Sequence, residues 1–214
     1  MNTETKLWRN LLRLTLIASA ILLLGLLVGT WAYAQGGSIA GTVTTPDGGP
    51  IPDHTYVWLL NPDYSTHGQA QVDPGDGSFS FGAIPAGHYI LRAVPPASSD
   101  YTPSNFTPVS VLHSPVNVGL IPLTRPTITG TVYAPNHVTP ADAWMHVYDA
   151  AGKTLEVRAA ISGEIKLGGL PVGSYVLQAE PMGDDNYWWS PRQTVTPPQE
   201  VTVTLRPANV FGHV

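Results

Sequence analysis

The sequence contains no cysteine and few charged residues. Without Cys there can be no disulfide bond and no lipid-modified N-terminal Cys, so an exported form of the chain must rely on its hydrophobic cores for stability. Charged residues make up 12% of the 214 residues and hydrophobic residues 43%, the reverse of the composition of disordered chains. Gly and Pro, by contrast, occur 21 times each, well above their usual combined share of about 12%. So many helix breakers exclude a helical bundle and predict short strands.

The N-terminal segment has the pattern of a secretory signal. Lys6, Arg9 and Arg13 precede the uncharged stretch 14–31, and Ala32-Tyr33-Ala34 supplies the small residues that a signal peptidase requires. We expect cleavage after Ala34 and a secreted or otherwise extracytoplasmic protein. The alternative is an uncleaved anchor with extracytoplasmic domains, because eighteen helical residues span about 27 Å of a bilayer core of roughly 30 Å. Membrane contact is then expected only through residues 14–31.

The charge of the chain after cleavage excludes one class of partner. Removing residues 1–34 takes away three of ten basic and one of fifteen acidic residues, which leaves seven basic and fourteen acidic residues. Nucleic-acid binding needs a basic footprint, so we expect no nucleic-acid partner.

The remaining chain contains two similar copies of one unit. Segment 38–43 (Ser-Ile-Ala-Gly-Thr-Val) matches 127–132 (Thr-Ile-Thr-Gly-Thr-Val), and 84–93 matches 170–179. Within each copy, apolar and polar residues alternate between clusters of Gly, Pro and Asp, the period of half-buried strands. We therefore predict an all-β fold of two tandem Greek-key β-sandwiches. The predicted boundaries are 1–34 for the signal peptide or anchor, 35–124 and 125–206 for the two sandwiches, and 207–214 for a C-terminal tail.

Two phrases of the first copy resemble a known family. Residues 76–81 (Asp-Gly-Ser-Phe-Ser-Phe) and 84–93 (Ile-Pro-Ala-Gly-His-Tyr-Ile-Leu-Arg-Ala) resemble the carboxypeptidase regulatory-like domain family. The resemblance covers both copies but is weaker in the second, where 162–167 replaces the aromatic strand. It implies a prealbumin-like (transthyretin-like) sandwich, grouped with the carbohydrate-binding-like folds. Such domains are accessory modules on exported enzymes, receptors and adhesins, so the resemblance implies a fold and no chemistry.

The sequence carries no recognisable catalytic or metal motif. No Ser stands in a Gly-x-Ser-x-Gly frame, and the seven His residues lack the His-Glu-x-x-His spacing of zinc hydrolases. Asp73, Asp76 and Ser78 could offer oxygens to Ca²⁺, but no bidentate Glu follows, so we interpret them as a hairpin turn. We therefore expect a non-enzymatic protein without a cofactor or metal, with an unrecognised hydrolase as the remote alternative.

The inward positions of the predicted strands define two cores. Gly87 and Gly173, each two residues before a Tyr, are expected at turn positions where a Cβ would clash. The predicted core residues are Val43, Val57, Leu59, Phe79, Phe81, Ile84, Tyr89, Leu91 and Ala93 in the first copy, and Val132, Met145, Val147, Ile165, Leu167, Leu170, Tyr175, Leu177 and Ala179 in the second.

The second predicted strand of each copy carries aromatic residues on the face opposite to the core. Aromatic rings stack on the C–H faces of sugars, so an outward aromatic strip is a candidate glycan platform. The alternative is that these rings pack against the other copy, a partner chain or nearby loops. The expected outward residues are Tyr56, Trp58 and Leu60 in one copy and Trp144, His146 and Tyr148 in the other. The candidate binding residues are Tyr56, Trp58, Trp144 and Tyr148, together with Tyr187, Trp188 and Trp189 on a Gly/Asp-rich loop.

These features predict a binding or structural module at the cell envelope or outside the cell. Its expected partner is a polysaccharide or another envelope protein. A carbohydrate-binding protein that uses the outward aromatic strips is the alternative to a purely structural role.

Overall fold

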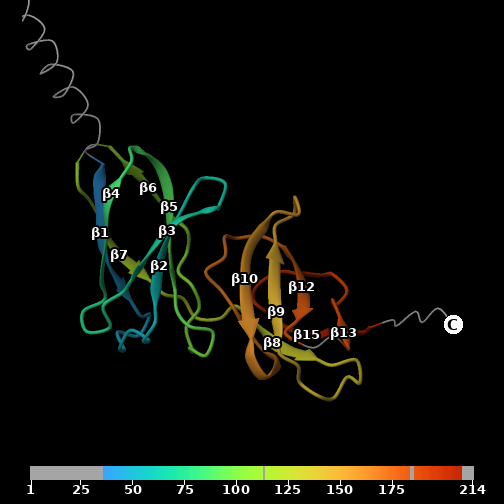
Figure 1. The fold of residues 1–214 in the computed structure, drawn as a ribbon. Coiled ribbons are helices and arrows are strands. Elements are labelled where there is room, and N and C mark those ends of the chain that lie inside the picture. The colour runs from blue at the N-terminus through green and yellow to red at the C-terminus, as the bar shows by residue number, and fades with distance from the viewer. Residues whose placement is uncertain (1–35, 113, 184–185, 209–214) are drawn as a thin grey trace, which may run out of the picture.

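The computed structural model describes residues 36–112, 114–183 and 186–208, which form two β-sandwiches joined by a short connection (Figure 1). The predicted signal peptide or anchor, 1–34, lies outside the described residues, as does most of the predicted tail. Within the described ranges, a 3₁₀ turn is found at Ile161–Gly163, and no helix has the length and apolar character needed to cross a membrane.

The first sandwich consists of seven strands in two sheets. Its strands are β1 (Gly37–Thr44), β2 (Tyr56–Leu60), β3 (Thr66–Gln71), β4 (Ser78–Ile84), β5 (Gly87–Val94), β6 (Thr107–Val111) and β7 (Val116–Pro122). One sheet has the order β4-β1-β7 and the other the order β3-β2-β5-β6. Within the first sheet, β1 pairs antiparallel with β4 and parallel with β7.

The second sandwich repeats this arrangement strand for strand. Its strands are β8 (Ile128–Tyr133), β9 (Ala143–Tyr148), β10 (Thr154–Ala160), β11 (Glu164–Leu167), β12 (Tyr175–Pro181), β14 (Gln193–Val195) and β15 (Gln199–Thr204). The sheet orders are β11-β8-β15 and β10-β9-β12-β14, and β8 pairs parallel with β15 as β1 does with β7. An added pair, β13 (Tyr187–Trp188) and β16 (Arg206–Pro207), extends this half. The prediction of an all-β sandwich fold is confirmed.

Each sandwich encloses its own hydrophobic core, as the alternating pattern predicts. All nine residues predicted for the first core are buried in it. The predicted residues of the second core are buried too, except Leu170, which is partly buried and packs against that core. On β2, Val57 and Leu59 are fully buried while Trp58 between them is exposed, which confirms the inward and outward faces assigned to this strand.

The expectation for Gly87 and Gly173 is wrong. The atoms nearest to a Cβ at Gly87 belong to the Tyr89 side chain, at 3.3 Å, a tight contact with a side chain and not with backbone; at Gly173 the one atom within 4 Å is the Tyr175 hydroxyl, at 3.9 Å, and neither glycine has a positive φ. What the two turns share is a hydrogen bond from the Tyr hydroxyl to the carbonyl of the Pro four residues earlier. Each turn is therefore closed by the Tyr side chain and does not depend on the conformational freedom of glycine.

A buried serine fastens the loop after the fifth strand in both sandwiches. The Ala93 amide donates to Ser104 Oγ at 2.9 Å, and the Ser104 amide donates back to the Ala93 carbonyl at 2.9 Å. Ala179 and Ser190 make the same two bonds at 2.8 and 2.9 Å. Both serines are fully buried. The repeat therefore extends to a side chain that satisfies a buried backbone amide.

Replacing Ser190 by Ala is expected to lower the free energy of unfolding by about 1–3 kcal/mol, because the buried Ala179 amide would lose its partner. Urea unfolding followed by tryptophan emission measures the change. Ser80→Ala, at an exposed position on β4, is the matched control and should leave the midpoint unchanged. An unaltered midpoint for Ser190→Ala would mean that water replaces the hydroxyl.

Candidate functional site

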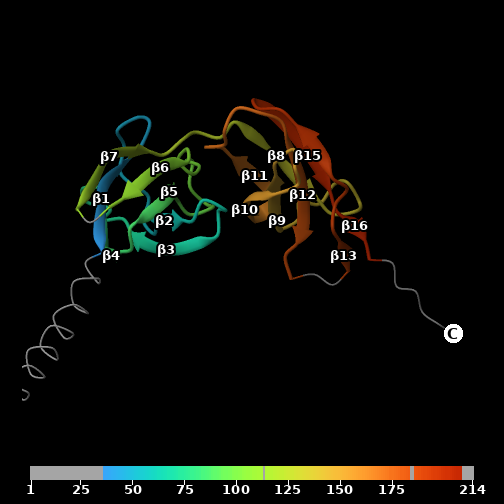
Figure 2. The ribbon, with the colours of Figure 1, turned by 90° about the horizontal axis from the view of Figure 1, so that it is seen from above.

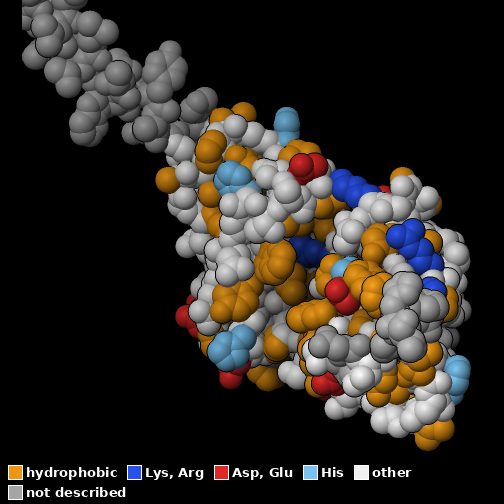
Figure 3. All heavy atoms as spheres, turned by 45° about the vertical axis from the view of Figure 1, so that its right-hand side comes forward, with side chains coloured by type: hydrophobic (Ala, Val, Ile, Leu, Met, Phe, Trp, Pro, Cys, Tyr) orange, Lys and Arg blue, Asp and Glu red, His pale blue; other side chains and the backbone are white. Residues whose placement is uncertain are grey.

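The outward aromatic faces of the two copies meet at a groove between the sandwiches. Trp58 on β2 and Trp144 on β9 both line it, with 38% and 41% of their surface exposed. The groove has a volume of about 600 Å³, within the range of small-molecule sites. Figure 3 shows the hollow between the two parts of the molecule, with hydrophobic side chains on both walls. The groove brings together two candidate residues that lie 86 positions apart in the sequence.

The strand alternation and the packing of the two sheets place these rings. On β2, Trp58 pairs with Arg92 of β5, so the indole and the guanidinium share the outer face of the first sandwich. On β9, Trp144 pairs with Ala159 of β10, the strand of the second sandwich that lies towards the first (Figures 1 and 2). Leu60 of the first sandwich adds apolar surface to the groove walls.

A buried ion pair joins the two sandwiches beside the groove. Arg92 Nη2 lies 2.8 Å from Glu156 Oε2 on β10, and both side chains are about 95% buried, with exposures of 5% and 6%. The same guanidinium donates to the carbonyls of Ser104, at 3.3 Å, and Gly168, at 3.4 Å. It also lies 4.4 Å above the Phe106 ring. Arg92 therefore contacts both halves of the molecule.

Arg158, two residues after Glu156, is a second buried cation at this junction. Its Nη1 donates to the Pro95 carbonyl at 3.4 Å, and its Nη2 donates to the carbonyls of Pro96, at 3.1 Å, and Tyr101, at 3.3 Å. Its Nε is buried without a hydrogen-bond partner in the described structure. Burial lowers the pKa of Arg158; Glu156 opposes this effect and the nearby charge of Arg92 adds to it.

A further contact between the sandwiches involves their turns. Lys153 Nζ, just before β10, lies 4.2 Å above the Tyr64 ring, and Tyr64 lines the groove. Tyr64 in turn packs against Phe106, with ring centroids 5.1 Å apart. The Lys153–Tyr64 contact therefore links the two sandwiches, and Phe106 supports the Tyr64 ring from within the first.

The outward position of Tyr148 does not expose it, contrary to expectation. Tyr148 is only 9% exposed, because His146 stacks beside it at 6.1 Å and the Arg192 guanidinium lies 5.0 Å above its ring. His146 is itself covered by Trp189, at 4.8 Å, and pairs with Glu180 at 2.8 Å. Leu60 is likewise only 6% exposed, at the groove. Loops and the neighbouring sandwich cover positions that alternation alone places outside.

The other candidates lie apart from the groove. Tyr56 is half-buried and is not among the lining residues, and Tyr187 packs partly against the second core. Trp188 is 61% exposed on β13. Of the seven candidates, the structure therefore brings Trp58 and Trp144 to one site.

Sequence reasoning missed the three charged residues at the junction. Glu156 and Arg158 pair with Val147 and Met145 of β9, so they lie on the core-facing side of a strand at the sheet edge. Charged residues at two successive inward positions were a signal that something other than the strand's own core covers them.

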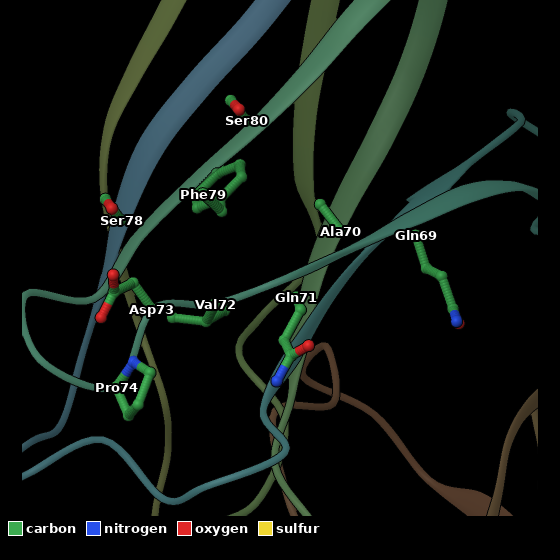
Figure 4. Close-up of a pocket in the computed structure, with 9 residues that line it drawn as sticks. All are labelled: Gln69, Ala70, Gln71, Val72, Asp73, Pro74, Ser78, Phe79 and Ser80. Atoms are coloured by element: carbon green, nitrogen blue, oxygen red, sulfur yellow. The ribbon is translucent and has the colours of Figure 1, made fainter.

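A second hollow, of about 640 Å³, lies in the first sandwich, where the edge strands β3 and β4 diverge (Figure 4). Ala70 on β3 and Phe79 on β4 lie on either side of the gap. In the turn that closes this hollow, the Asp carboxylates accept hydrogen bonds from backbone amides of the same turn. Asp73 Oδ1 accepts from the Gly75 amide and Asp76 Oδ1 from the Ser78 amide, both at 2.8 Å. The predicted turn is confirmed, but it is not a hairpin, because the strands it joins, β3 and β4, belong to different sheets.

The carboxylates of this turn are engaged within it. Hydrogen bonds from the side chain and amide of Ser78 lower the pKa of Asp76. Across the parts of the chain that the structure describes, no group of three or more His, Asp or Glu side chains is placed to hold a metal ion. The groove between the sandwiches is therefore the stronger candidate site.

Comparisons with known proteins give no family. No family model matches the chain, and no curated protein sequence matches it. The resemblance to carboxypeptidase regulatory-like domains thus stays a prediction.

Several solved structures have a low similarity to this chain. The Bacillus anthracis TIE protein has 13% identity and a TM-score of 0.34 over 80% of this chain, which spans about a third (34%) of that protein. The shaft pilin SpaA from Lactobacillus rhamnosus GG has 9% identity and a TM-score of 0.36, covering 83% of this chain and 100% of that one. The minor pilin GBS52 of Streptococcus agalactiae has 15% identity and a TM-score of 0.30, covering 83% and 99%. Scores of this size carry no conclusion about function.

Proposed function

We propose that the protein is an exported, non-enzymatic binding module that holds a ligand in the groove between its two sandwiches. The observation that carries the proposal is that Trp58 and Trp144, from equivalent strands of the two copies, line one groove. The signal pattern of residues 1–34 supports a place outside the cytoplasm. We divide the exported chain into domains 35–124 and 125–206, with the groove between them.

The exposure of the two indoles supports binding over simple packing. Large aromatic side chains in a concave surface are typical anchors for ligands, since covering them removes much apolar area from water. The Arg92–Glu156 pair and the Arg158 contacts already hold the two walls together. Ligand binding should therefore cost little conformational entropy in the protein. A polysaccharide is the ligand class that fits stacking between flat rings.

Trp58→Ala and Trp144→Ala are each expected to weaken ligand binding by about tenfold or more, because each removes one stacking surface. The measurement is a titration of residues 35–214, which contain both cores, with a panel of soluble neutral and acidic oligosaccharides, followed by tryptophan emission and calorimetry. Trp188→Ala is the control, since this ring lies outside the groove lining. Equal loss in all three variants, or no saturable signal with any glycan, would contradict a groove ligand.

A second candidate function is a structural element that contacts another envelope protein. The favouring observation is Trp188, which is 61% exposed on the short β13–β16 pair at the far side of the second sandwich. Light scattering of residues 35–214 tests for self-association through this ring. A dimer mass that Trp188→Ala abolishes would support the structural role, and a monomer in both forms would count against self-association.

A further inference from the structure

We infer that the groove selects an acidic oligosaccharide, one whose sugar rings carry carboxylates. The inference rests on the proposed function of the groove and adds the chemical class of its ligand. It combines two features of the lining: flat aromatic surface from both sandwiches, and positive charge that the protein itself neutralises only in part.

The charge comes from the charged residues that line the groove, Arg92, Arg158 and Glu156. The single carboxylate pairs with Arg92 at 2.8 Å. Arg158 donates only to backbone carbonyls, and its Nε has no partner in the described structure. Arginine stays protonated at neutral pH, so two guanidinium groups face one carboxylate. A ligand carboxylate would supply the missing negative charge, and guanidinium groups are well suited to pair with it.

The positive charge of the two arginines lies where it can attract a ligand carboxylate. Arg92 and Arg158 are the basic residues among those that line the groove, and a basic side chain is visible within the hollow in Figure 3. Both side chains are nearly buried, so the local dielectric is low and an uncompensated charge there is costly. A ligand carboxylate placed against the Arg158 side chain, which lines the groove, would relieve this cost.

The walls favour sugar rings over a peptide. Besides the two indoles, they present Leu60, Val94 and Val157, apolar surface that can lie against the C–H faces of sugar rings. An extended peptide could bind by adding a strand to the free edge of β10. The first sandwich lies along this edge, since Glu156 and Arg158 bond across it to the other half. Stacking on the C–H faces of sugars needs no such edge.

The test compares two forms of one ligand on residues 35–214 by calorimetry and tryptophan emission. The probes are tri-galacturonate and its full methyl ester, which share the rings and differ in charge. We expect the acid to bind about tenfold or more tightly than the ester at low salt. Raising NaCl to about 0.5 M should reduce this difference, because salt screens the ionic contribution. In Trp58→Ala both probes should bind about tenfold more weakly, and the emission change should be smaller because Trp144 alone then reports from the groove.

The variant that isolates the charge is Arg158→Met, which keeps the apolar stem. It should lose most of the preference for the acid over the ester. Arg125→Met is the matched control, because Arg125 pairs with Asp47 at an exposed site outside the groove lining and should leave the preference intact. If Arg158→Met does not fold, the acid–ester ratio of the native protein and its salt dependence decide the question.

Three outcomes would overturn the inference. Equal affinity for acid and ester would remove the charge selectivity while leaving the groove as a binding site. A hexaglutamate peptide that binds as tightly as the acid would assign the groove to acidic peptides. Absence of binding by both galacturonate forms would exclude this ligand class, and the wider glycan panel with Trp58→Ala and Trp144→Ala then decides whether the groove binds sugars at all.

Discussion

Gly130→Ala is expected to destabilise the second sandwich by about 3 kcal/mol or more. Gly130 on β8 lies opposite Val201 on the parallel strand β15, and a Cβ at this position would overlap the Val201 carbonyl oxygen. Its φ of 155° is also one that side chains rarely adopt. The obstacle is backbone in a sheet, so no side-chain rotation can relieve it, and the two strands would have to separate.

Urea unfolding of residues 35–214, followed by tryptophan emission, measures this effect. Gly68→Ala on β3 is the control, because a Cβ there meets no atom within 4 Å. It should leave stability unchanged or raise it slightly, since Ala restricts the unfolded chain. A wild-type midpoint for Gly130→Ala would contradict the close approach of β8 and β15.

The equivalent glycine of the first copy should be less sensitive. A Cβ at Gly41 would meet Val118 Cγ2 at 2.7 Å, Phe79 Cε1 at 2.9 Å and the Gly119 carbonyl oxygen at 2.9 Å. Two of these three atoms belong to side chains that can shift. In both copies, the glycine of the repeated Gly-Thr-Val phrase is thus a position where an added Cβ would run into the parallel partner strand.

The sandwich cores were predictable because they depend on local alternation. Each strand places residues of one parity inward, and a strand such as β2 shows this parity directly, with Val57 and Leu59 buried and Trp58 outside. The turns between strands follow from Asp, Gly and Pro in the same local way. Each of these patterns extends over a few residues, so it can be recognised in the sequence without knowledge of the rest of the fold.

The groove was not predictable in the same way, because it depends on how one sandwich lies against the other. Alternation places Trp58, Trp144 and Tyr148 outside their sheets but does not tell what covers them. Tyr148 is covered by Arg192 and His146, whereas the two indoles stay open at the groove. The Arg192 contact joins residues 44 positions apart in the sequence (148 and 192), so the alternation within one strand cannot predict it.

Glu156→Ala is expected to lower the free energy of unfolding by about 3–5 kcal/mol, because it leaves Arg92 buried between the sandwiches without its carboxylate. Chemical unfolding of residues 35–214 measures the loss. Arg125→Met, which breaks the exposed pair with Asp47, is the control and should keep a midpoint near that of the native protein. A Glu156→Ala protein of native stability would mean that water reaches Arg92 in place of the carboxylate.

The double variant Arg92→Met/Glu156→Leu separates the role of this pair in stability from its role in binding. Apolar side chains of similar size often replace a buried ion pair without loss, so its stability should return towards the native value. The balance of charge at the groove is unchanged in the double variant, because one cation and one anion leave together and Arg158 stays. It should therefore keep the preference for an acidic over an esterified saccharide. Glu156→Ala removes only the anion and should strengthen that preference in whatever fraction of the protein stays folded.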